Sequence, residues 1–504
     1  MSLNPKLSVK TILYLFLVII VAGCGQQEAK KPPSSKTGNA ATAVPALPVK
    51  SMRDDLFILW SAIKEMHPAY GMYTPADSMR KVYDQTLAAI NSPQSEADFI
   101  SHVYPLLSKL RCGHTQLRHA AGYKGVKTPH LPFEVLVRNG RARVTTHQTA
   151  DLNTGDEILS INNVPVAAII SHGADLYAGD GYNETFKELF LSEYDGFEDA
   201  CNTYYHWVAP YHITLRTKTG KLKTMQVDAL ADGAPQPIPA KVVDNYAGWA
   251  VAKNTDYLPL RFLKNSPTAW FEVHSYQYND TIIFKEVFKQ IREKGIKNLI
   301  IDLRHNTGGD IRIGAKLLTY LADSPFTMVG DVNSRIPNPA VNHFEKYFDT
   351  ARTASFNQSF KPTGIKVGAY YHVDFKPVFG NLLRITALDK TAHFSGNLIV
   401  LIDGATFSAG AHSAIALKTF CKNARFVGRE TAGGAEGCSG GTIQYLTLPN
   451  THIVVEFPWL RFVSVAKHPA LGHGIMPDYT VEYSPDDVVD KADPDIKKAL
   501  SLIK

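Results

Sequence analysis

Two apolar segments that each end in a glycine-containing turn constrain the fold of this chain more than any other feature of its sequence. The first runs from Leu299 to Asp310 (LIIDLRHNTGGD) and the second from Leu398 to Gly410 (LIVLIDGATFSAG). Each has the continuous apolar character of a buried strand and leads into a segment with helical periodicity. Together with the strand and helix patterns of residues 269–295, they predict βαβ connections and a core of mostly parallel strands.

The two turns are also the places where a functional site is expected, because ligands in α/β folds bind at the carboxyl ends of the strands. Ser408 stands at the start of the helix GAHSAIALKTF, where free N–H groups favour a developing negative charge. Glycines permit close backbone approach, so the N–H groups of Gly308 and Ala409 could form an oxyanion hole. Two simpler interpretations stay open: Ser408 as an ordinary helix N-cap, and the glycines as a turn that needs positive φ.

The amino terminus has the pattern of an export signal. Lys6 and Lys10 precede an apolar run that ends in Val-Ala-Gly-Cys24, and this run is short for a spanning helix. The VAGC tetrapeptide resembles a bacterial lipobox, which implies cleavage before Cys24 and acylation of that residue. We expect a signal peptide at residues 1–24, a flexible tether at 25–48, and a globular part outside the cytoplasm. The alternative is an uncleaved amino-terminal anchor.

Residues 49–127 are expected to form a helical cap. Apolar residues recur at helical spacing from Ser51, which with Asp54 makes a capping box. Further helices are predicted after Thr74-Pro75 and after Ser95. A glycine then stops the helical pattern and presents His114 on the following turn. The alternative interpretation of His114 is a hydrogen-bonded structural histidine.

From about Leu131 the period changes to two, and we expect a β-rich module over residues 128–260. Within it, the sequence GDEILSINNV (155–164) predicts a strand, a turn and a strand, and it resembles a segment of PDZ domains with Asn163 at the usual glycine position. Asparagine tolerates the left-handed geometry of such a turn. The sequence YHITLRTKTGKLKTMQV (211–227) predicts a hairpin. The remainder of residues 170–260 has no assignable pattern.

Composition and charge exclude several classes. Of the 504 residues 45% are hydrophobic and 20% charged, which suits a large folded core, and the net charge of +6 contains no basic cluster, so no nucleic-acid partner is expected. No CxxC or HExxH spacing is present, so we expect no metal site. Four cysteines besides Cys24 allow three disulfide pairings, and the sequence does not choose among them: Cys112, Cys201, Cys421 and Cys438.

Several motifs resemble, in order, those of the C-terminal processing and tricorn-type serine peptidases. They are IDLRHNTGGD, GATFSAG, VGRETAGGAEGCSGG and GHGIMPDYTVEY, with EMHPAYGMY and LRCGHTQL in the helical cap. The resemblance implies a multidomain α/β protein: a helical cap, a PDZ-like β module and a βαβ-type catalytic core of the crotonase-like type at residues 261–485. A carboxyl-terminal helix is expected at residues 486–504.

The same resemblance implies the catalytic pair. The processing branch uses a lysine in a GKG-like turn, where this chain has Gly433-Gly434-Ala435, so a serine and lysine dyad is not expected. The tricorn branch takes its base from the cap, at the position of His114 here. Ser408 is therefore expected to be the nucleophile and His114 the general base.

Two positions depart from the tricorn pattern. Gly113 stands where that branch has serine, and Leu471 stands where it has glutamate. The group that orients His114 is therefore open among Glu436, Asp478 and a backbone carbonyl. The aromatic residues Phe407 and Phe457 to Trp459 are expected either to line an apolar substrate pocket or, as the simpler interpretation, to be core residues.

The expected function is a serine peptidase of the cell envelope, held on the membrane through lipidated Cys24. It would act on peptides or proteins without a cofactor, and its oligomeric state is left open. The alternative is a peptide- or lipid-binding lipoprotein on a peptidase scaffold without activity, because one fold can host binding or catalysis.

Overall fold

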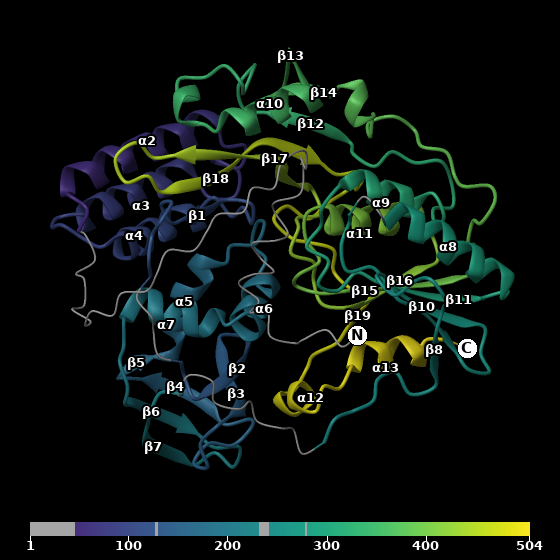
Figure 1. The fold of residues 1–504 in the computed structure, drawn as a ribbon, viewed down its shortest axis with the longest axis horizontal. Coiled ribbons are helices and arrows are strands. Elements are labelled where there is room, and N and C mark those ends of the chain that lie inside the picture. Colours follow the sequence, from purple (N-terminus) through teal and green to yellow (C-terminus); the bar gives the residue numbers. More distant parts are fainter. Residues whose placement is uncertain (1–45, 126–129, 231–240, 278–279, 504) are drawn as a thin grey trace, which may run out of the picture. The chain divides into compact units, whose positions relative to one another are not determined.

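The computed structural model describes residues 46–125, 130–230, 241–277 and 280–503. The predicted signal sequence, Cys24 and nearly all of the predicted tether lie outside the described residues. Residues 47–504 belong to one unit, whose elements carry the labels of Figure 1. Within the described ranges, none of the helices combines the length and the apolar character that crossing a membrane requires.

The cap contains the helices α2 (Val49–Met66), α3 (Ala76–Ala89) and α4 (Glu96–Ser108). Helix α4 begins as predicted, because the Ser95 side chain accepts a hydrogen bond from the N–H of Asp98. The capping box predicted at the start of the first helix is wrong. Helix α2 begins at Val49, so Ser51 lies inside it, and Asp54 accepts a hydrogen bond from Lys50 instead.

The next part is an antiparallel sheet in the order β2-β3-β4-β6-β7. Its strands are β2 (Phe133–Arg138), β3 (Arg141–His147), β4 (Glu157–Ile161), β6 (Tyr211–Arg216) and β7 (Leu222–Val227), with β5 (Val164–Pro165) paired to β4. The predicted strand, turn and strand are confirmed, because Asn162 and Asn163 make the two-residue turn with φ of 47° and 65°. The predicted hairpin is confirmed as β6 and β7.

Three helices accompany this sheet: α5 (Val166–Leu176), α6 (Thr185–Glu193) and α7 (Gly196–Tyr205). Helix α6 lies along the edge strand β2, where the N–H of Val137 donates to Oγ of Ser192 at 2.8 Å. The N–H of Asn139 likewise donates to Oε1 of Glu188 at 2.6 Å. Side chains of α6 therefore satisfy part of the free edge of the sheet.

The predicted parallel core is confirmed as a seven-stranded sheet in the order β19-β16-β15-β11-β10-β9-β8. Its strands are β8 (Trp249–Val251), β9 (Leu260–Leu263), β10 (Thr268–Glu272), β11 (Asn298–Asp302), β15 (Asn397–Ile402), β16 (Ala424–Gly428) and β19 (Tyr479–Thr480). Strands β10, β11, β15, β16 and β19 pair in parallel, whereas β8 and β9 are antiparallel.

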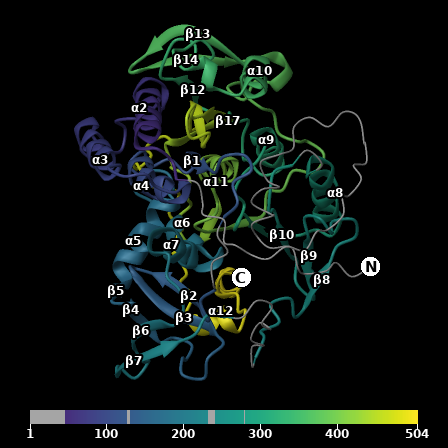
Figure 2. The same ribbon diagram turned by 60° about the vertical axis from the view of Figure 1, so that its left-hand side comes forward.

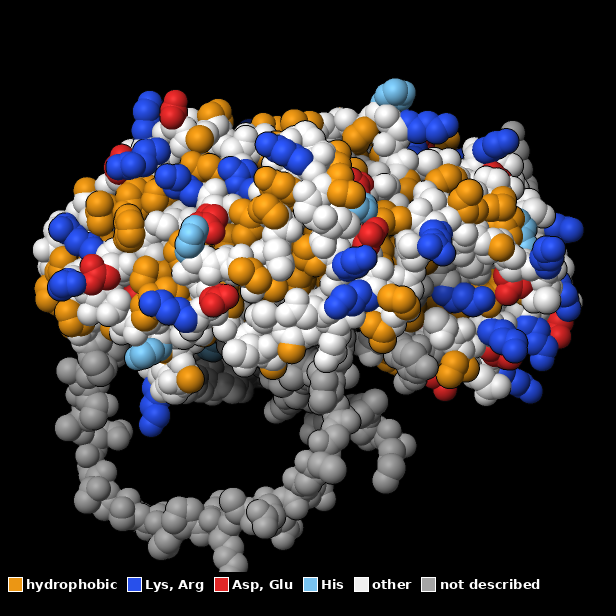
Figure 3. Space-filling view, turned by 90° about the horizontal axis from the view of Figure 1, so that it is seen from above, with side chains coloured by type: hydrophobic (Ala, Val, Ile, Leu, Met, Phe, Trp, Pro, Cys, Tyr) orange, Lys and Arg blue, Asp and Glu red, His pale blue; other side chains and the backbone are white. Residues whose placement is uncertain are grey.

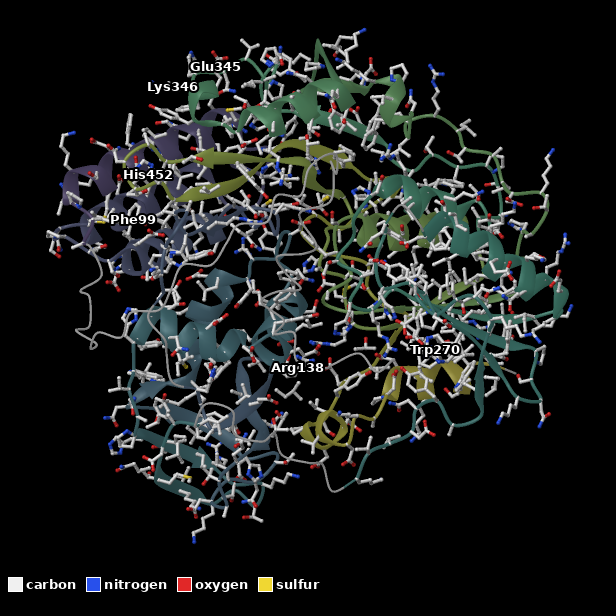
Figure 4. The ribbon with its side chains drawn as sticks, in the orientation of Figure 1. Phe99, Arg138, Trp270, Glu345, Lys346 and His452 are labelled. Carbon is white, nitrogen blue, oxygen red and sulfur yellow. The ribbon has the colours of Figure 1, made fainter. Side chains whose placement is uncertain are left out.

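Both faces of the parallel sheet are covered, which explains why its strands are apolar without alternation. One face carries Ile301 and Val400 and packs against α8 (Asp280–Glu293), α9 (Ile311–Leu318) and α11 (Ala409–Phe420). The other face carries Trp270 and packs against α13 (Pro494–Ser501), as Figure 4 shows.

A third sheet joins the cap to the core, in the order β1-β18-β12-β14-β13 with β17 also paired to β18. Its strands are β1 (Gln116–Arg118), β12 (Asp331–Ser334), β13 (Phe360–Val367), β14 (Tyr370–Phe375), β17 (Gly437–Thr447) and β18 (Val454–Val463). The short strand β1 follows the cap helices and pairs with β18, with Gln116 opposite Glu456. The views of Figures 1 and 2 agree in placing α2 to α4 beside this sheet.

Two predicted boundaries need correction. Strand β8, at residues 249–251, falls in the predicted 128–260 module, but it pairs with β9 and so belongs to the parallel sheet. The single helix predicted at residues 486–504 is two short helices, α12 (Pro485–Val489) and α13, because Asp493 and Pro494 start a new helix with its own N-cap. The other predicted domain boundaries stay predictions.

Charged side chains of both signs are scattered among hydrophobic ones on the face shown in Figure 3.

Candidate active site

The two glycine-containing turns lie side by side because they follow adjacent parallel strands, β11 and β15. The N–H of Phe407 in the second turn donates to the carbonyl oxygen of Asn306 in the first, at 3.0 Å. The buried side chain of Asn306 also accepts from the N–H of Gly308 and donates to the carbonyl oxygen of Val273. Asn306 therefore ties the turns together, a role that its sequence did not reveal.

Ser408 sits at the N-cap position of α11 but does not act as a cap. Its φ is 51° and its ψ is −123°, and its side chain makes no capping hydrogen bond. A non-glycine residue in this region costs of the order of 1–3 kcal/mol and persists only where the surroundings hold it. Because the Ser408 side chain does not cap α11, the N-cap interpretation does not account for this serine.

His114 reaches Ser408 from the cap. Its Nε2 lies 3.0 Å from Oγ of Ser408, across 294 positions of sequence. Two contacts hold the loop that carries it: the N–H of Gly113 donates to Oδ1 of Asp180 at 3.1 Å, and the N–H of Gly181 donates to the carbonyl oxygen of Arg111. With β1 anchored to β18 immediately afterwards, the histidine is fixed on both sides.

The surroundings of His114 favour a neutral ring. Burial and the neighbouring His412 lower the pKa of His114 to about 4, while the backbone of Ser439 acts in the opposite direction. The Ser439 backbone is near the ring but makes no hydrogen bond with it. Nδ1 of His114 has no hydrogen-bond partner among the described residues. A neutral imidazole can accept the Ser408 proton, which is the state that a general base requires.

Packing leaves little room for a side chain at Gly113. A Cβ at this position would lie 2.6 Å from Cζ of Phe407 and 3.1 Å from the carbonyl oxygen of Ala178. The Phe407 ring occupies that space and packs on His114, with ring centroids 4.4 Å apart. The aromatic residue before the serine and the glycine before the histidine therefore fit each other.

The two predicted oxyanion donors differ in their hydrogen bonds. The N–H of Ala409 makes no hydrogen bond to another described residue, as expected for the first turn of a helix. The N–H of Gly308 is taken by Oδ1 of Asn306 at 2.9 Å. Gly308 itself lies against the serine turn, since a Cβ there would be 2.8 Å from the N of Ala409. The oxyanion hole stays a prediction.

Neither carboxylate that the sequence offered as an orienting group contacts His114 by hydrogen bond. Asp478 accepts from Lys418 and from the N–H of Phe426. Glu436 accepts at Oε1 from the hydroxyl of Tyr73 at 2.5 Å and from the N–H of Gly472 at 3.0 Å. Leu471 is 52% exposed and so does not take the place of a buried glutamate.

The carboxylate beside His114 is Asp180, which the sequence analysis missed. It is 2% exposed, and one of its oxygens lies within 4.8 Å of a ring nitrogen of His114. Burial raises the pKa of Asp180 to about 8, the N–H of Gly113 acts against this, and nearby Glu436 adds to it. Only the tertiary contact identifies this residue, because its sequence neighbours lie in the segment without an assignable pattern.

Phe457 and Trp459 belong to the core, as the simpler interpretation predicted. They are 0% and 1% exposed and pack against Phe348. Of the aromatic residues proposed for a substrate pocket, only Phe407 packs on His114.

The four cysteines of the described chain are free and buried. None of the three possible disulfide pairings is formed among them. Cys112 and Cys438 are close to the site, since Sγ of Cys438 lies 3.6 Å from Nε2 of His412 and Cys112 is two residues before His114.

A comparison with protein-family models matches residues 268–481 to peptidase family S41. This range contains both turns and Ser408, whereas His114 and Asp180 lie before it. A comparison with curated proteins finds no match.

Solved structures extend the similarity beyond that range. The crystal structure of mature CPAF is similar with a TM-score of 0.59 and 15% identity, covering 90% of this chain and 96% of that one. Mature CPAF complexed with lactacystin is similar with the same TM-score and identity, covering 90% and 97%. The tricorn protease has a TM-score of 0.40 at 14% identity, with 90% of this chain and 36% of that one covered.

At these identities the likeness to CPAF shows a shared fold over 90% of this chain. The fold is a mixed α/β arrangement of several sheets and helices, as the sequence predicted. The family match over residues 268–481 implies a peptide or protein substrate. The match of residues 268–481 to peptidase family S41 supports a serine peptidase in this part of the chain.

Proposed function

We propose that this protein hydrolyses peptide bonds with Ser408 as the nucleophile and His114 as the general base. The observation that carries the proposal is the 3.0 Å separation of Nε2 of His114 and Oγ of Ser408, within the range for direct proton transfer. The left-handed φ of Ser408 supports it, because strained backbone at a reactive residue is typical of catalytic turns.

In this mechanism the Ser408 oxygen attacks the peptide carbonyl while His114 takes the hydroxyl proton. The same proton then passes to the departing amine, and a water molecule hydrolyses the acyl-enzyme with His114 again as base. The N–H of Ala409 is the proposed donor to the oxyanion. The N–H of Gly308 joins it only by leaving Oδ1 of Asn306.

Asp180 is the proposed positioning residue for His114. The burial that keeps the imidazole neutral also disfavours the imidazolium that forms during the reaction. Burial keeps Asp180 largely protonated while His114 is neutral. An imidazolium within 4.8 Å favours the ionised carboxylate, and the two opposite charges then stabilise each other. Asp180 would thus position and stabilise His114, the role that the resemblance to the tricorn branch assigns to a glutamate.

The finer architecture and the location are part of the proposal. The β4-β5 hairpin with its two asparagines and the antiparallel order of the second sheet support a PDZ-like module. The parallel sheet with helices on both faces supports a crotonase-like core. The VAGC sequence supports acylation of Cys24 and a place in the cell envelope. Incorporation of labelled palmitate that is lost in Cys24→Ala would test the anchor.

The test of the catalytic pair is covalent labelling of the purified full chain with a fluorophosphonate probe. Labelling is expected for the wild type, and none for Ser408→Ala or His114→Ala. Ser413→Ala is the matched control, because Ser413 is a fully buried serine of the same helix. Lactacystin, present in one of the similar structures, would serve as a competitor of labelling. A folded wild type that fails to label would favour the non-catalytic binding protein.

A further inference from the structure

We propose that Cys112, His114 and Asp180 form a binding site for a thiophilic divalent cation such as Zn²⁺, and that occupying this site switches the peptidase off. One ligand atom from each residue, a thiol sulfur, a ring nitrogen and a carboxylate oxygen, lies within 4.8 Å of the other two. These are the three ligand types that zinc prefers in proteins. The switching part of the proposal rests on His114 being the catalytic base.

The geometry is close to that of a metal site. With metal-ligand distances of about 2.0–2.3 Å, tetrahedral ligand atoms lie about 3.4–3.6 Å apart. The present separations of up to 4.8 Å need a contraction of about 1 Å, which side-chain rotation can supply. Three protein ligands would leave a fourth position open to water, as in zinc sites that exchange ligands.

The backbone already gathers the three ligands. Cys112 and His114 flank Gly113, whose N–H holds Oδ1 of Asp180 at 3.1 Å. The loop and the aspartate are therefore fixed to each other in the absence of a cation, which reduces the ordering cost of binding.

Two of the three ligand residues carry buried polar atoms that lack a partner. Oδ2 of Asp180 and Nδ1 of His114 make no hydrogen bond to any described residue. Both Asp180 and Cys112 are 2% exposed. Unpartnered buried polar atoms are rare and call for an explanation, and a cation would give them one.

The charges nearby act in both directions. Glu436, which adds to the pKa of Asp180, has a second unpartnered oxygen and favours a cation, whereas Arg461 opposes one. Binding would require the Cys112 thiol to release its proton to solvent, along with any proton held by Asp180. The metal then receives the sulfur, nitrogen and oxygen lone pairs, and no electron transfer is involved.

Metal binding and catalysis exclude each other, whichever nitrogen of His114 is used. If Nδ1 binds the cation, Nε2 must carry the ring proton and can no longer accept that of Ser408. If Nε2 binds the cation, the 3.0 Å contact with Ser408 is broken. In either case the serine loses its base.

The first experiment measures binding without relying on activity. Co²⁺ is titrated into the full-length Ser408→Ala protein, and thiolate-to-cobalt absorption is followed. One equivalent is expected, displaced by Zn²⁺, with the absorption lost in Cys112→Ala and the affinity at least tenfold weaker in Asp180→Asn. Cys421→Ala, which removes a buried cysteine bonded to the carbonyl oxygen of Leu321, should keep the signal. Absence of the band, or its persistence in Cys112→Ala, would overturn the site.

The second experiment tests the switch. Zn²⁺ should prevent fluorophosphonate labelling of the wild type, while Cys112→Ala should label equally well with and without Zn²⁺. Equal inhibition of wild type and Cys112→Ala would refute the switch. A wild type that binds Co²⁺ but never labels would refute the proposed function and leave the metal site standing. Cys112→Ser, a closer isostere, replaces Cys112→Ala if the latter does not fold.

Discussion

Two histidines of this protein stand beside catalytic motifs, yet their surroundings assign them opposite states. Among the described residues His114 makes one hydrogen bond, to Ser408, and burial lowers its pKa to about 4. His305 lies in the turn after β11, where Nδ1 contacts Asp403 and Nε2 contacts Glu193, both at 2.7 Å. Although burial by itself lowers it, these carboxylates raise the pKa of His305 well above its usual value.

The comparison teaches that the partners of a histidine, rather than its place in a motif, decide its role. His305 is held as a cation by two carboxylates and has no free lone pair, so it cannot act as a base. It stabilises the turns instead, since its N–H and those of neighbouring residues converge on Asp403. His114 keeps a lone pair on one ring nitrogen because no carboxylate among the described residues makes a hydrogen bond to the ring and favours its protonated form.

Replacing the two histidines separately gives the largest expected effect on activity. His114→Ala should lower kcat/KM for a fluorescent casein by about 10²–10⁴, the usual contribution of a general base. His305→Asn, measured in parallel, should retain most of the activity. Equal losses in the two variants would mean that His114 acts only as a structural residue.

Asp180→Asn should have the next largest effect on hydrolysis. The amide keeps an oxygen for the N–H of Gly113 but cannot ionise, so it cannot supply the negative charge that stabilises a protonated His114. An opposite charge within about 4–6 Å stabilises an ionised group by about 1.4 kcal/mol or more, so kcat/KM should fall at least about 10-fold. Asp478→Asn serves as the control, because Asp478 also accepts from a backbone N–H, that of Phe426, and makes no hydrogen bond to His114. Wild-type activity of Asp180→Asn would remove Asp180 from the mechanism.

Gly113→Ala probes the packing around His114. The new methyl group would lie 2.6 Å from Cζ of Phe407, so we expect a loss of about 1–2 kcal/mol of stability, in the lower part of the range for overpacking because the ring can shift. Urea denaturation measures it. Phe407→Leu should recover part of the loss in the double variant, and a strictly additive double variant would contradict the explanation.

His305→Asn should give the smallest effect, about 1 kcal/mol of stability, because its side chain is 45% exposed and solvent screens the pair. Since the folded pKa of His305 is raised, its contribution is complete below about pH 6.5 and is lost as the pH rises towards the folded value. Burial raises the pKa of Asp403, but His305 lowers it more, to about 2. The contribution of Asp403 to stability is therefore complete above about pH 4 and is lost as the pH falls towards about 2.

The denaturation difference between wild type and His305→Asn should therefore be larger at pH 6 than at pH 9. If the difference in unfolding free energy instead grew with pH, His305 would be neutral in the folded protein. The contrast between His305 and His114 would then fail.

Local pattern was sufficient for much of the fold. The helix after Ser95, the turn at Asn162 and Asn163 and the parallel strands around Ile301 and Val400 all follow from short-range periodicity and turn chemistry. Where local pattern failed, a neighbour in space decided. Asp54 suggested a capping box but pairs with Lys50, and residues 249–251 join a sheet whose other strands come later in the chain.

The sequence by itself determined the catalytic candidates, because Ser408 and His114 lie in motifs whose order along the chain can be read directly. The tertiary structure decided what acts on them. Asp180 lies 67 positions from Gly113, and Asp403 lies 98 positions from His305, so no local spacing links either pair. The pKa of a histidine depends on charges and solvent within a few ångströms, and only the folded chain brings those groups together.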